Sequence, residues 1–151
     1  MLKLIPPIIS AELIYAMMLT GHGDDLLVCD INHPAASIAR DTVWGEIINL
    51  SGCGIPVALE AILTLYPLDT FVSAPVMRMK VVGDPDKNLP LFDRVQKLVD
   101  SAAGHAIPMQ ALERFDFYAA ARKCFAVVRT SDPGPYGCFI LRKGVIEGLI
   151  G

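Results

Sequence analysis

Short apolar segments of strand length alternate with helix-like segments along most of this chain, and this alternation limits the fold more than any other feature. The run 26–29 (LLVC) is continuously apolar, as is typical of a strand buried on both faces of a sheet. The other segments with strand character are 45–50, 74–82, 106–112, 125–130 and 138–145. Helices are expected between them, at 11–20, 35–40, 55–66, 89–102 and 116–124.

Strands and helices in this order predict an α/β protein with helices covering both faces of a mainly parallel sheet. Because only a short turn, 131–137, separates the last two strands, we expect them to form one antiparallel pair. Ser10 is expected to cap the first helix and Asp116 the last. We therefore predict a single three-layer α/β/α domain over residues 1–151, with a mixed sheet of about six strands.

The composition is unusually apolar for a chain of this size. Hydrophobic residues make up 53% and charged residues 19%, and the mean hydropathy is +0.46. The longest apolar stretch is interrupted by Glu60 and Pro67 and falls short of the ~20 residues that span a bilayer. An apolar excess without a membrane span indicates that part of it is buried between subunits, so we predict a homo-oligomer.

The charge pattern argues against nucleic-acid binding. The net charge is −3, and lysine and arginine are scattered rather than gathered into a basic stripe. The four cysteines are isolated, without the CxxC spacing of zinc or redox sites, and are expected to be reduced core residues. The N-terminal segment lacks the long apolar region of a signal peptide. These features predict a cytoplasmic protein that does not associate with membranes.

A histidine between two glycines precedes the first buried strand, in the stretch GHGDDLLVCDIN (21–32). The plain interpretation is a helix end followed by a core strand, since a loop histidine is usually a surface residue. The functional interpretation is a general acid or base, His22, that acts with a polar substrate anchor, Asp30, at the carboxyl end of the strand. A five-residue strand separates the two by more than about 15 Å. Either they line one long cleft, or a second chain completes the site.

Three other patterns are weaker. The stretch SGCGIP (51–56) resembles half of a dinucleotide-binding fingerprint, but Val57 occupies the position of the third glycine. Cys29, Asp30 and His33 are three possible metal ligands, yet alternation along a strand directs the first two to opposite faces. The chain has no G-x-S-x-G nucleophile elbow. A nucleotide site, a metal site and a serine-hydrolase site are therefore all disfavoured.

Polar-tipped side chains gather near the end of the chain. Arg114, Tyr118 and Tyr136 lie beside strands or in loops and are of the kind that bind sugar hydroxyls, because arginine offers a planar set of donors and tyrosine a hydroxyl on an apolar ring. An interface arginine with two half-buried tyrosines is equally common in oligomers. Composition does not separate these alternatives.

Four stretches, MLKLIPPIISAELIYAMMLTGHGDDLLVCDIN, RFDFY, FAVVRTSDPGPYG and LRKGV, resemble the fucose mutarotase / D-ribose pyranase family. The resemblance covers nearly the whole chain, and its most specific combination is GHGD, then D-x-N, then PYG near the end. It implies a small cytoplasmic enzyme that opens and recloses a sugar hemiacetal without a cofactor or a metal. It also implies a ring-shaped homo-oligomer, often a decamer, with active sites at subunit contacts.

The same resemblance implies roles for individual residues. His22 matches the family's proton donor. The positions that match substrate-binding residues are Asp30, Arg114, Tyr118, Tyr136, Gly137 and Cys138. Arg114 matches the fucose branch of the family, because the ribose branch places a histidine there. Cys138 departs from the pattern, which has asparagine at that position, and this departure bears on which sugar is bound more than on the type of reaction.

The leading hypothesis is therefore a mutarotase that interconverts the α and β anomers of L-fucose or a related sugar. The nearest alternative is D-ribose pyranase activity, which Arg114 argues against. A non-catalytic sugar-binding protein is a further alternative from a different functional class. A nucleotide-binding module comes last, because of Val57.

Overall fold

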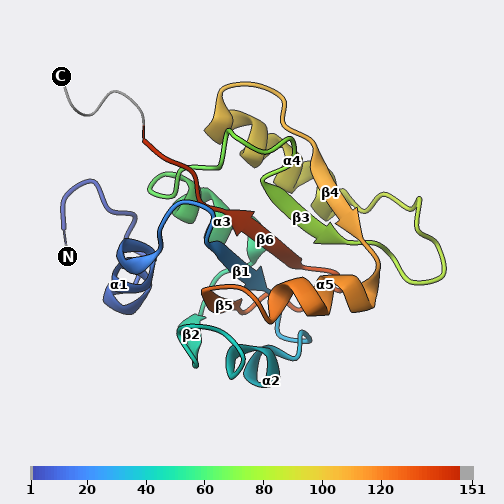
Figure 1. The fold of residues 1–151 in the computed structure, drawn as a ribbon, viewed down its shortest axis with the longest axis horizontal. Coiled ribbons are helices and arrows are strands. Elements are labelled where there is room, and N and C mark those ends of the chain that lie inside the picture. Colours follow the sequence, from blue (N-terminus) through green and yellow to red (C-terminus); the bar gives the residue numbers. More distant parts are fainter. Residues whose placement is uncertain (1, 147–151) are drawn as a thin grey trace.

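The structure is a computed structural model that describes residues 2–146, and a six-stranded mixed sheet forms its centre (Figure 1). The strands are β1 (Asp25–Cys29), β2 (Ile47–Leu50), β3 (Val76–Met79), β4 (Met109–Leu112), β5 (Ala126–Thr130) and β6 (Cys138–Arg142). The helices are α1 (Ala11–Leu19), α2 (Ala35–Ala39), α3 (Ile55–Leu63), α4 (Pro90–Ala103) and α5 (Arg114–Ala121). The predicted α/β fold and the number of strands are confirmed.

The strand order is β2-β5-β1-β6-β3-β4, so β1 lies in the interior of the sheet. Parallel pairs join β2 to β5, β5 to β1, and β3 to β4. Strand β6 runs antiparallel to both of its neighbours, β1 and β3. Three of the five pairings are thus parallel, as expected for a mainly parallel sheet.

The expected antiparallel pair between the last two strands is wrong. β5 and β6 are antiparallel in direction but do not touch, because β1 lies between them. The connection 131–137 crosses over the carboxyl end of β1 instead of making a hairpin. It is held there by backbone hydrogen bonds from Asp30 N–H to Gly137 O (2.7 Å) and from Ile31 N–H to Asp132 O (3.1 Å). This crossing brings the PYG turn onto the end of β1.

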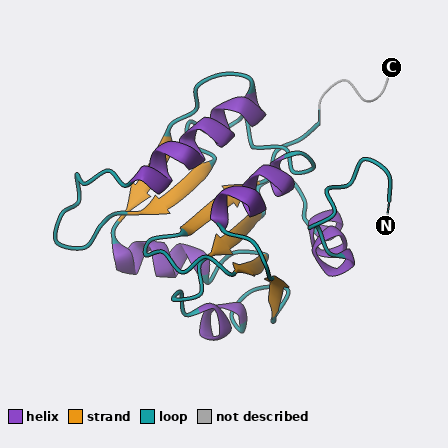
Figure 2. Cartoon of the chain, turned by 180° about the vertical axis from the view of Figure 1, so that it is seen from behind, coloured by secondary structure: helices purple, strands orange, loops and turns teal. Residues whose placement is uncertain are grey.

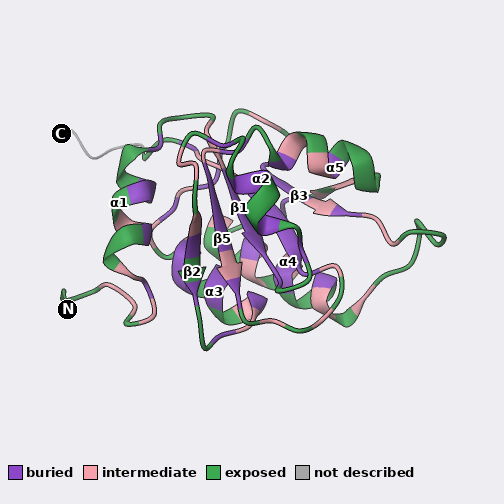
Figure 3. Ribbon diagram, turned by 90° about the horizontal axis from the view of Figure 1, so that it is seen from below, coloured by how far each residue is buried: buried purple, intermediate pink, exposed green. Residues whose placement is uncertain are grey.

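Helices cover both faces of the sheet. Figure 1 shows α5 and α2 on the near face, and the view from behind in Figure 2 shows α3 and α4 on the other. Alternate residues of β1 pack into two hydrophobic cores, one on each face of the sheet. Leu26 and Val28 pack with α1, α3 and α4. Leu27 and Cys29 pack with α2 and α5. Figure 3 shows β1 and β5 buried along almost their whole length. The continuously apolar run 26–29 is therefore explained by burial on both sides.

One of the two predicted helix caps is confirmed. The Ser10 hydroxyl accepts a hydrogen bond from the backbone N–H of Leu13 (3.1 Å). The prediction for the last helix is wrong: α5 begins at Arg114, with Glu113 as its N-cap, and Asp116 lies in the first turn. The helix starts directly after β4 because this placement turns Phe117 and Ala121 into the core. Asp116 still stabilises the helix there, since a negative charge is favourable near the amino end.

All four cysteines are free and buried, as expected: Cys29, Cys53, Cys124 and Cys138. Large apolar side chains nevertheless remain on the surface, including Leu4 (97% exposed), Met18 (76%), Phe115 (73%) and Phe71 (68%). None of the helices within residues 2–146 has the length and apolar character needed to cross a bilayer.

Candidate sugar-binding site

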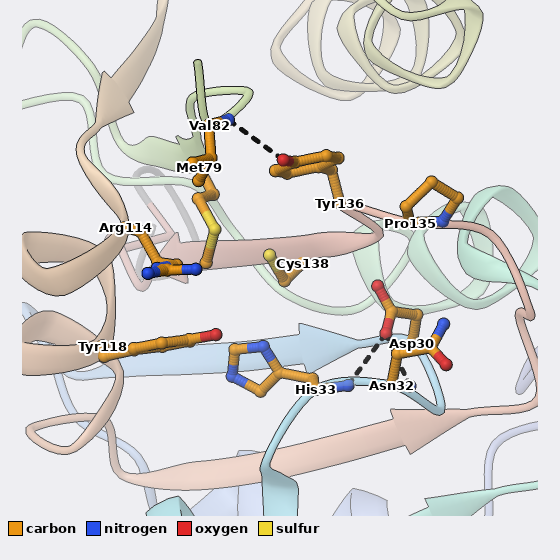
Figure 4. A pocket seen from close by; sticks show the side chains of 10 residues that line it. All are labelled: Asp30, Asn32, His33, Met79, Val82, Arg114, Tyr118, Pro135, Tyr136 and Cys138. Atoms are coloured by element: carbon orange, nitrogen blue, oxygen red, sulfur yellow. Dashed lines mark hydrogen bonds between the residues drawn. The ribbon is translucent and has the colours of Figure 1, made fainter. Parts of the chain in front are cut away.

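A pocket of about 310 Å³ opens at one edge of the sheet, where β1, β3 and β4 end and β6 begins (Figure 4). Its walls come from segments far apart in the sequence. The lining residues are Asp30, Asn32, His33, Met79, Val82, Arg114, Tyr118, Pro135, Tyr136 and Cys138. Five of the residues expected to bind substrate are among them: Asp30, Arg114, Tyr118, Tyr136 and Cys138.

Asp30 is the most firmly held group of the pocket. Its side chain follows β1, and the residue is only 3% exposed. One carboxylate oxygen accepts the backbone N–H groups of Asn32 (2.8 Å) and His33 (2.9 Å), and the other accepts that of Gly137 (2.8 Å). Burial raises the pKa of Asp30, although these hydrogen bonds act in the opposite direction. The carboxylate is thus fixed in orientation before any ligand arrives.

Gly137 has a supporting role. It does not line the pocket, but its N–H holds Asp30. A Cβ at this position would lie 3.1 Å from Asp30 Cβ and 3.1 Å from Ile55 Cγ1, which is tighter than ordinary contact. The glycine therefore permits the close approach of the turn to β1.

Tyr136 joins two loops across the pocket. Its backbone is in the left-handed region (φ 60°), which is unfavourable for a residue with a side chain. Its hydroxyl accepts a hydrogen bond from Val82 N–H (3.0 Å), in the loop that follows β3. The strained turn directs the tyrosine ring over the pocket, and the hydrogen bond connects it to the opposite rim.

Arg114 and Tyr118 both come from α5 and are separated by about one helical turn, so they point to the same side. The Arg114 guanidinium lies 4.9 Å from the centroid of the exposed Phe115 ring. Facing them across the pocket is Cys138, which is 2% exposed, and burial raises the pKa of its thiol. Cys138 is therefore a neutral, weakly polar part of the wall.

His33 lines this pocket, although sequence reasoning considered it only as a metal ligand. Its ring packs edge-on against Phe117 (centroids 6.0 Å apart) and Tyr118 (5.6 Å). Burial lowers the pKa of His33 to about 4, so the ring is neutral at pH 7. A histidine before a proline is typical of an ordinary turn, so the sequence pattern does not indicate that His33 lines a pocket.

His22 lies outside this pocket, beyond the amino end of β1. Its Nε2 is 3.1 Å from Asp69 Oδ1, and its ring is 5.2 Å from the ring of Phe71. Asp69 is 3% exposed and also accepts the backbone N–H of Phe71 (3.0 Å). Burial alone would raise the pKa of Asp69, but these hydrogen bonds outweigh it and lower the pKa below its usual value. Asp69 was missed by sequence reasoning, because nothing local distinguishes it from other loop carboxylates.

Within one chain, the predicted site residues thus form two groups at opposite ends of β1. His22, with its hydrogen-bond partner Asp69, lies at the amino end, and the other predicted residues lie around Asp30 at the carboxyl end. Of the two arrangements expected from the sequence, one long cleft does not fit residues 2–146, because His22 is not part of the lining of the pocket around Asp30.

The burial of His33 has a measurable consequence for stability. The folded chain binds the His33 proton less readily than the unfolded chain, so this residue costs no stability above pH ~6.5 and costs progressively more as pH falls toward 4. Between pH 7 and pH 5 we expect the free energy of unfolding of the wild type to fall by about 2 kcal/mol relative to His33→Phe.

Urea titrations of both proteins at the two pH values test this expectation. The charged groups that share the pocket with His33, Asp30 and Arg114, are present in both proteins, so their titration largely cancels in the comparison. Equal pH dependence of the two proteins would contradict a buried, neutral His33.

Comparisons with known proteins agree with the resemblance seen in the sequence. The model of the RbsD / FucU transport protein family matches residues 3–146. The human fucose mutarotase is 42% identical over 149 residues, covering 96% of this chain and 94% of that protein. The crystal structure of the Streptococcus pneumoniae fucose mutarotase in complex with L-fucose is 34% identical, covers 96% of this chain and 99% of that one, and superposes with a TM-score of 0.85.

The fold extends to a more distant structure, Bacillus subtilis RbsD complexed with D-ribose. It is 17% identical, covers 97% of this chain and 99% of that one, and has a TM-score of 0.74, so it supports the fold alone. Together with the matched residues and the relatives above, the six-stranded sheet and its pocket establish that this chain belongs to the RbsD / FucU transport protein family.

Proposed function

We propose that this protein is a cofactor-independent isomerase that interconverts the α and β anomers of L-fucose. The observation that carries the proposal is the prearranged polar pocket around Asp30, in a chain 42% identical to a fucose mutarotase over nearly its full length. Asp30 and Arg114 offer a fixed acceptor and a planar donor to sugar hydroxyls, and the Tyr136 and Tyr118 rings supply apolar surface for the sugar. Arg114 favours L-fucose over D-ribose, as the family resemblance implies.

The chemistry requires only proton transfer. Ring opening removes the proton of the C1 hydroxyl and delivers a proton to the ring oxygen, while the bond between C1 and the ring oxygen breaks to leave an aldehyde. Rotation about the bond between C1 and C2 and reclosure on the other face give the second anomer. An imidazole exchanges protons in both directions near neutral pH, and such general acid–base catalysis contributes ~10²–10⁴-fold.

His22 is the candidate for this proton transfer, and Asp69 positions it. Because the pKa of Asp69 is lowered, its carboxylate accepts the hydrogen of His22 Nε2, and Nδ1 is then the ring nitrogen that can exchange a proton with the sugar. The pocket residues would hold hydroxyls remote from C1, so that C1 stays free to rotate.

A complete site then needs two copies of the chain. His22 and Asp30 lie at opposite ends of β1, which separates them by more than about 15 Å. We infer that His22 of one copy faces the pocket of a neighbouring copy. Exposed apolar side chains support this inference, because Phe71 lies near His22 and Phe115 lies near Arg114. A further apolar groove, of about 490 Å³, lies between α1 and the segment after β6.

The assembly and the cellular location are the finer parts of the proposal. The family resemblance implies a decameric ring in the cytoplasm, with the sites at subunit contacts. The apolar composition and the exposed apolar side chains support a homo-oligomer.

Saturation-transfer NMR on L-fucose tests the proposed activity. We expect the purified protein to accelerate exchange between the α and β anomer signals, in proportion to protein concentration. A parallel series with D-ribose separates the two sugars, and heat-denatured protein serves as the control. Faster pyranose–furanose exchange of D-ribose without an effect on L-fucose would instead support a ribose pyranase. Binding of L-fucose without faster exchange would show a non-catalytic sugar-binding protein.

A further inference from the structure

His33 is a polar residue of the pocket to which the proposed mechanism gives no role. His33 is only 8% exposed. Within residues 2–146, its Nε2 is the one buried side-chain nitrogen or oxygen that lacks a hydrogen-bond partner. A buried polar atom without a partner is unfavourable, and in native proteins it requires an explanation. Packing alone does not explain it, because a phenylalanine would fill the same space beside Phe117 and Tyr118.

The two ring nitrogens face different surroundings. Figure 4 shows Nδ1, the nitrogen next to the point of attachment, on the ring edge turned toward Cys138 and the interior of the pocket. Nε2 lies on the enclosed side of the ring, where His33 meets the aromatic side chains of α5. Because an unpaired acceptor is tolerated in a buried place better than an unpaired N–H, the single hydrogen of the neutral ring belongs on Nδ1. The ring then presents one donor to the pocket.

A hydrogen-bond donor at His33 has a role because the residue that it faces, Cys138, is only weakly polar. Cys138 stands where the family pattern has asparagine, so the carboxamide of that residue is missing and a buried thiol replaces it. Thiols are weak hydrogen-bond donors and acceptors. The Nδ1 atom of His33 faces Cys138, as do the polar ends of Arg114 and Tyr118.

We propose that His33 is a specificity-determining residue that donates a neutral hydrogen bond from Nδ1 to one hydroxyl of the bound sugar. This inference rests on the proposed function, since it assigns a role within the same pocket. It concerns binding and not proton transfer, so His33 changes the affinity for the sugar and leaves the exchange rate of the bound sugar nearly unchanged.

Two matched variants separate hydrogen bonding from packing. His33→Phe keeps an aromatic ring against Phe117 and Tyr118 but has no polar atom. His33→Asn loses the ring but carries an amide nitrogen the same number of bonds from Cα as Nδ1. We expect His33→Phe to bind L-fucose about tenfold more weakly by calorimetry, the loss of roughly one hydrogen bond, with a thermal midpoint equal to or above that of the wild type. His33→Asn should keep the affinity within about threefold while its thermal midpoint falls.

The contacted hydroxyl is identified with deoxy derivatives of L-fucose. Removing the hydroxyl that His33 contacts should weaken binding to the wild type about tenfold and leave binding to His33→Phe unchanged, because the interaction is already lost. In exchange kinetics, the KM of His33→Phe should rise and kcat should stay within about twofold of the wild type.

The outcomes distinguish this inference from the proposed function. A wild type that neither binds L-fucose nor accelerates its exchange would remove both. A wild type that binds and exchanges L-fucose, with a His33→Phe variant of equal affinity, would overturn the role of His33 alone. A His33→Phe variant that loses kcat but not affinity would assign His33 to the chemical step and also contradict the inference.

Discussion

Replacing His22 by alanine should lower the rate of L-fucose anomer exchange by about 10²–10⁴-fold, while L-fucose still binds. The imidazole is the proton-transferring group of the proposed mechanism, and the residues that line the pocket are untouched by the substitution. Because the His22 side chain is 46% exposed, its removal should cost little stability. Saturation-transfer NMR measures the exchange, and calorimetry measures the binding. Asp69→Asn is the matched control and should show a smaller loss, since it misplaces the imidazole without removing it.

Mixing two inactive variants tests whether the site is shared between chains. His22→Ala keeps an intact pocket, and Arg114→Ala keeps an intact His22. If His22 serves the pocket of a neighbour, co-refolded 1:1 mixtures should recover about a quarter of the wild-type activity, because one site in four then combines two native halves. If His22 served the pocket of its own chain, no mixture would exceed the residual activity of the separate variants.

The second large effect is expected at Asp30. Asp30→Ala should abolish detectable L-fucose binding and lower the free energy of unfolding by about 3 kcal/mol or more. The carboxylate accepts the backbone N–H groups of Asn32, His33 and Gly137, and alanine leaves all three without that acceptor. The turn 131–137 then loses a contact that holds it on the end of β1. Thermal unfolding and calorimetry measure the two effects.

Asp30→Asn is the control for the loss of charge alone. The amide oxygen can still accept the N–H groups of Asn32 and His33, but its NH₂ group faces the N–H of Gly137. We expect an intermediate loss of stability and a large loss of affinity. An Asp30→Ala variant that unfolds at the wild-type temperature would show that these hydrogen bonds contribute nothing net.

The sequence predicted those parts of the fold that depend on local pattern. The run 26–29 reads as a strand buried on both faces because its side chains alternate between two cores, and Ser10 reads as a cap because the motif is local. The neighbour of β6 was not predictable in this way. Strand order depends on contacts between distant segments, and a short connection normally implies a hairpin unless, as here, it crosses the end of another strand.

The same distinction between local pattern and distant contact applies to the residues of the candidate site. Asp30, Arg114 and Tyr136 were predicted because family motifs mark them, and the structure places all three at one pocket. The roles of Asp69 and His33 were not predicted, because each depends on contact with a residue that lies far away in the sequence or on another element. For Asp69 the contact is with His22, 47 residues away, and for His33 it is with the aromatic surface of α5.

The placement of His22 and Asp30 at opposite ends of a rigid interior strand has a consequence for how such a protein behaves in the cell. If His22 and the pocket around Asp30 act on one sugar, as proposed, an isolated copy would be inert, since no bending of β1 within the sheet brings the two ends together. The turnover rate per chain would then depend on the protein concentration. It would rise steeply once the concentration is high enough for the chains to associate. Expression level would thus set both the quantity of the catalyst and the fraction of it that works.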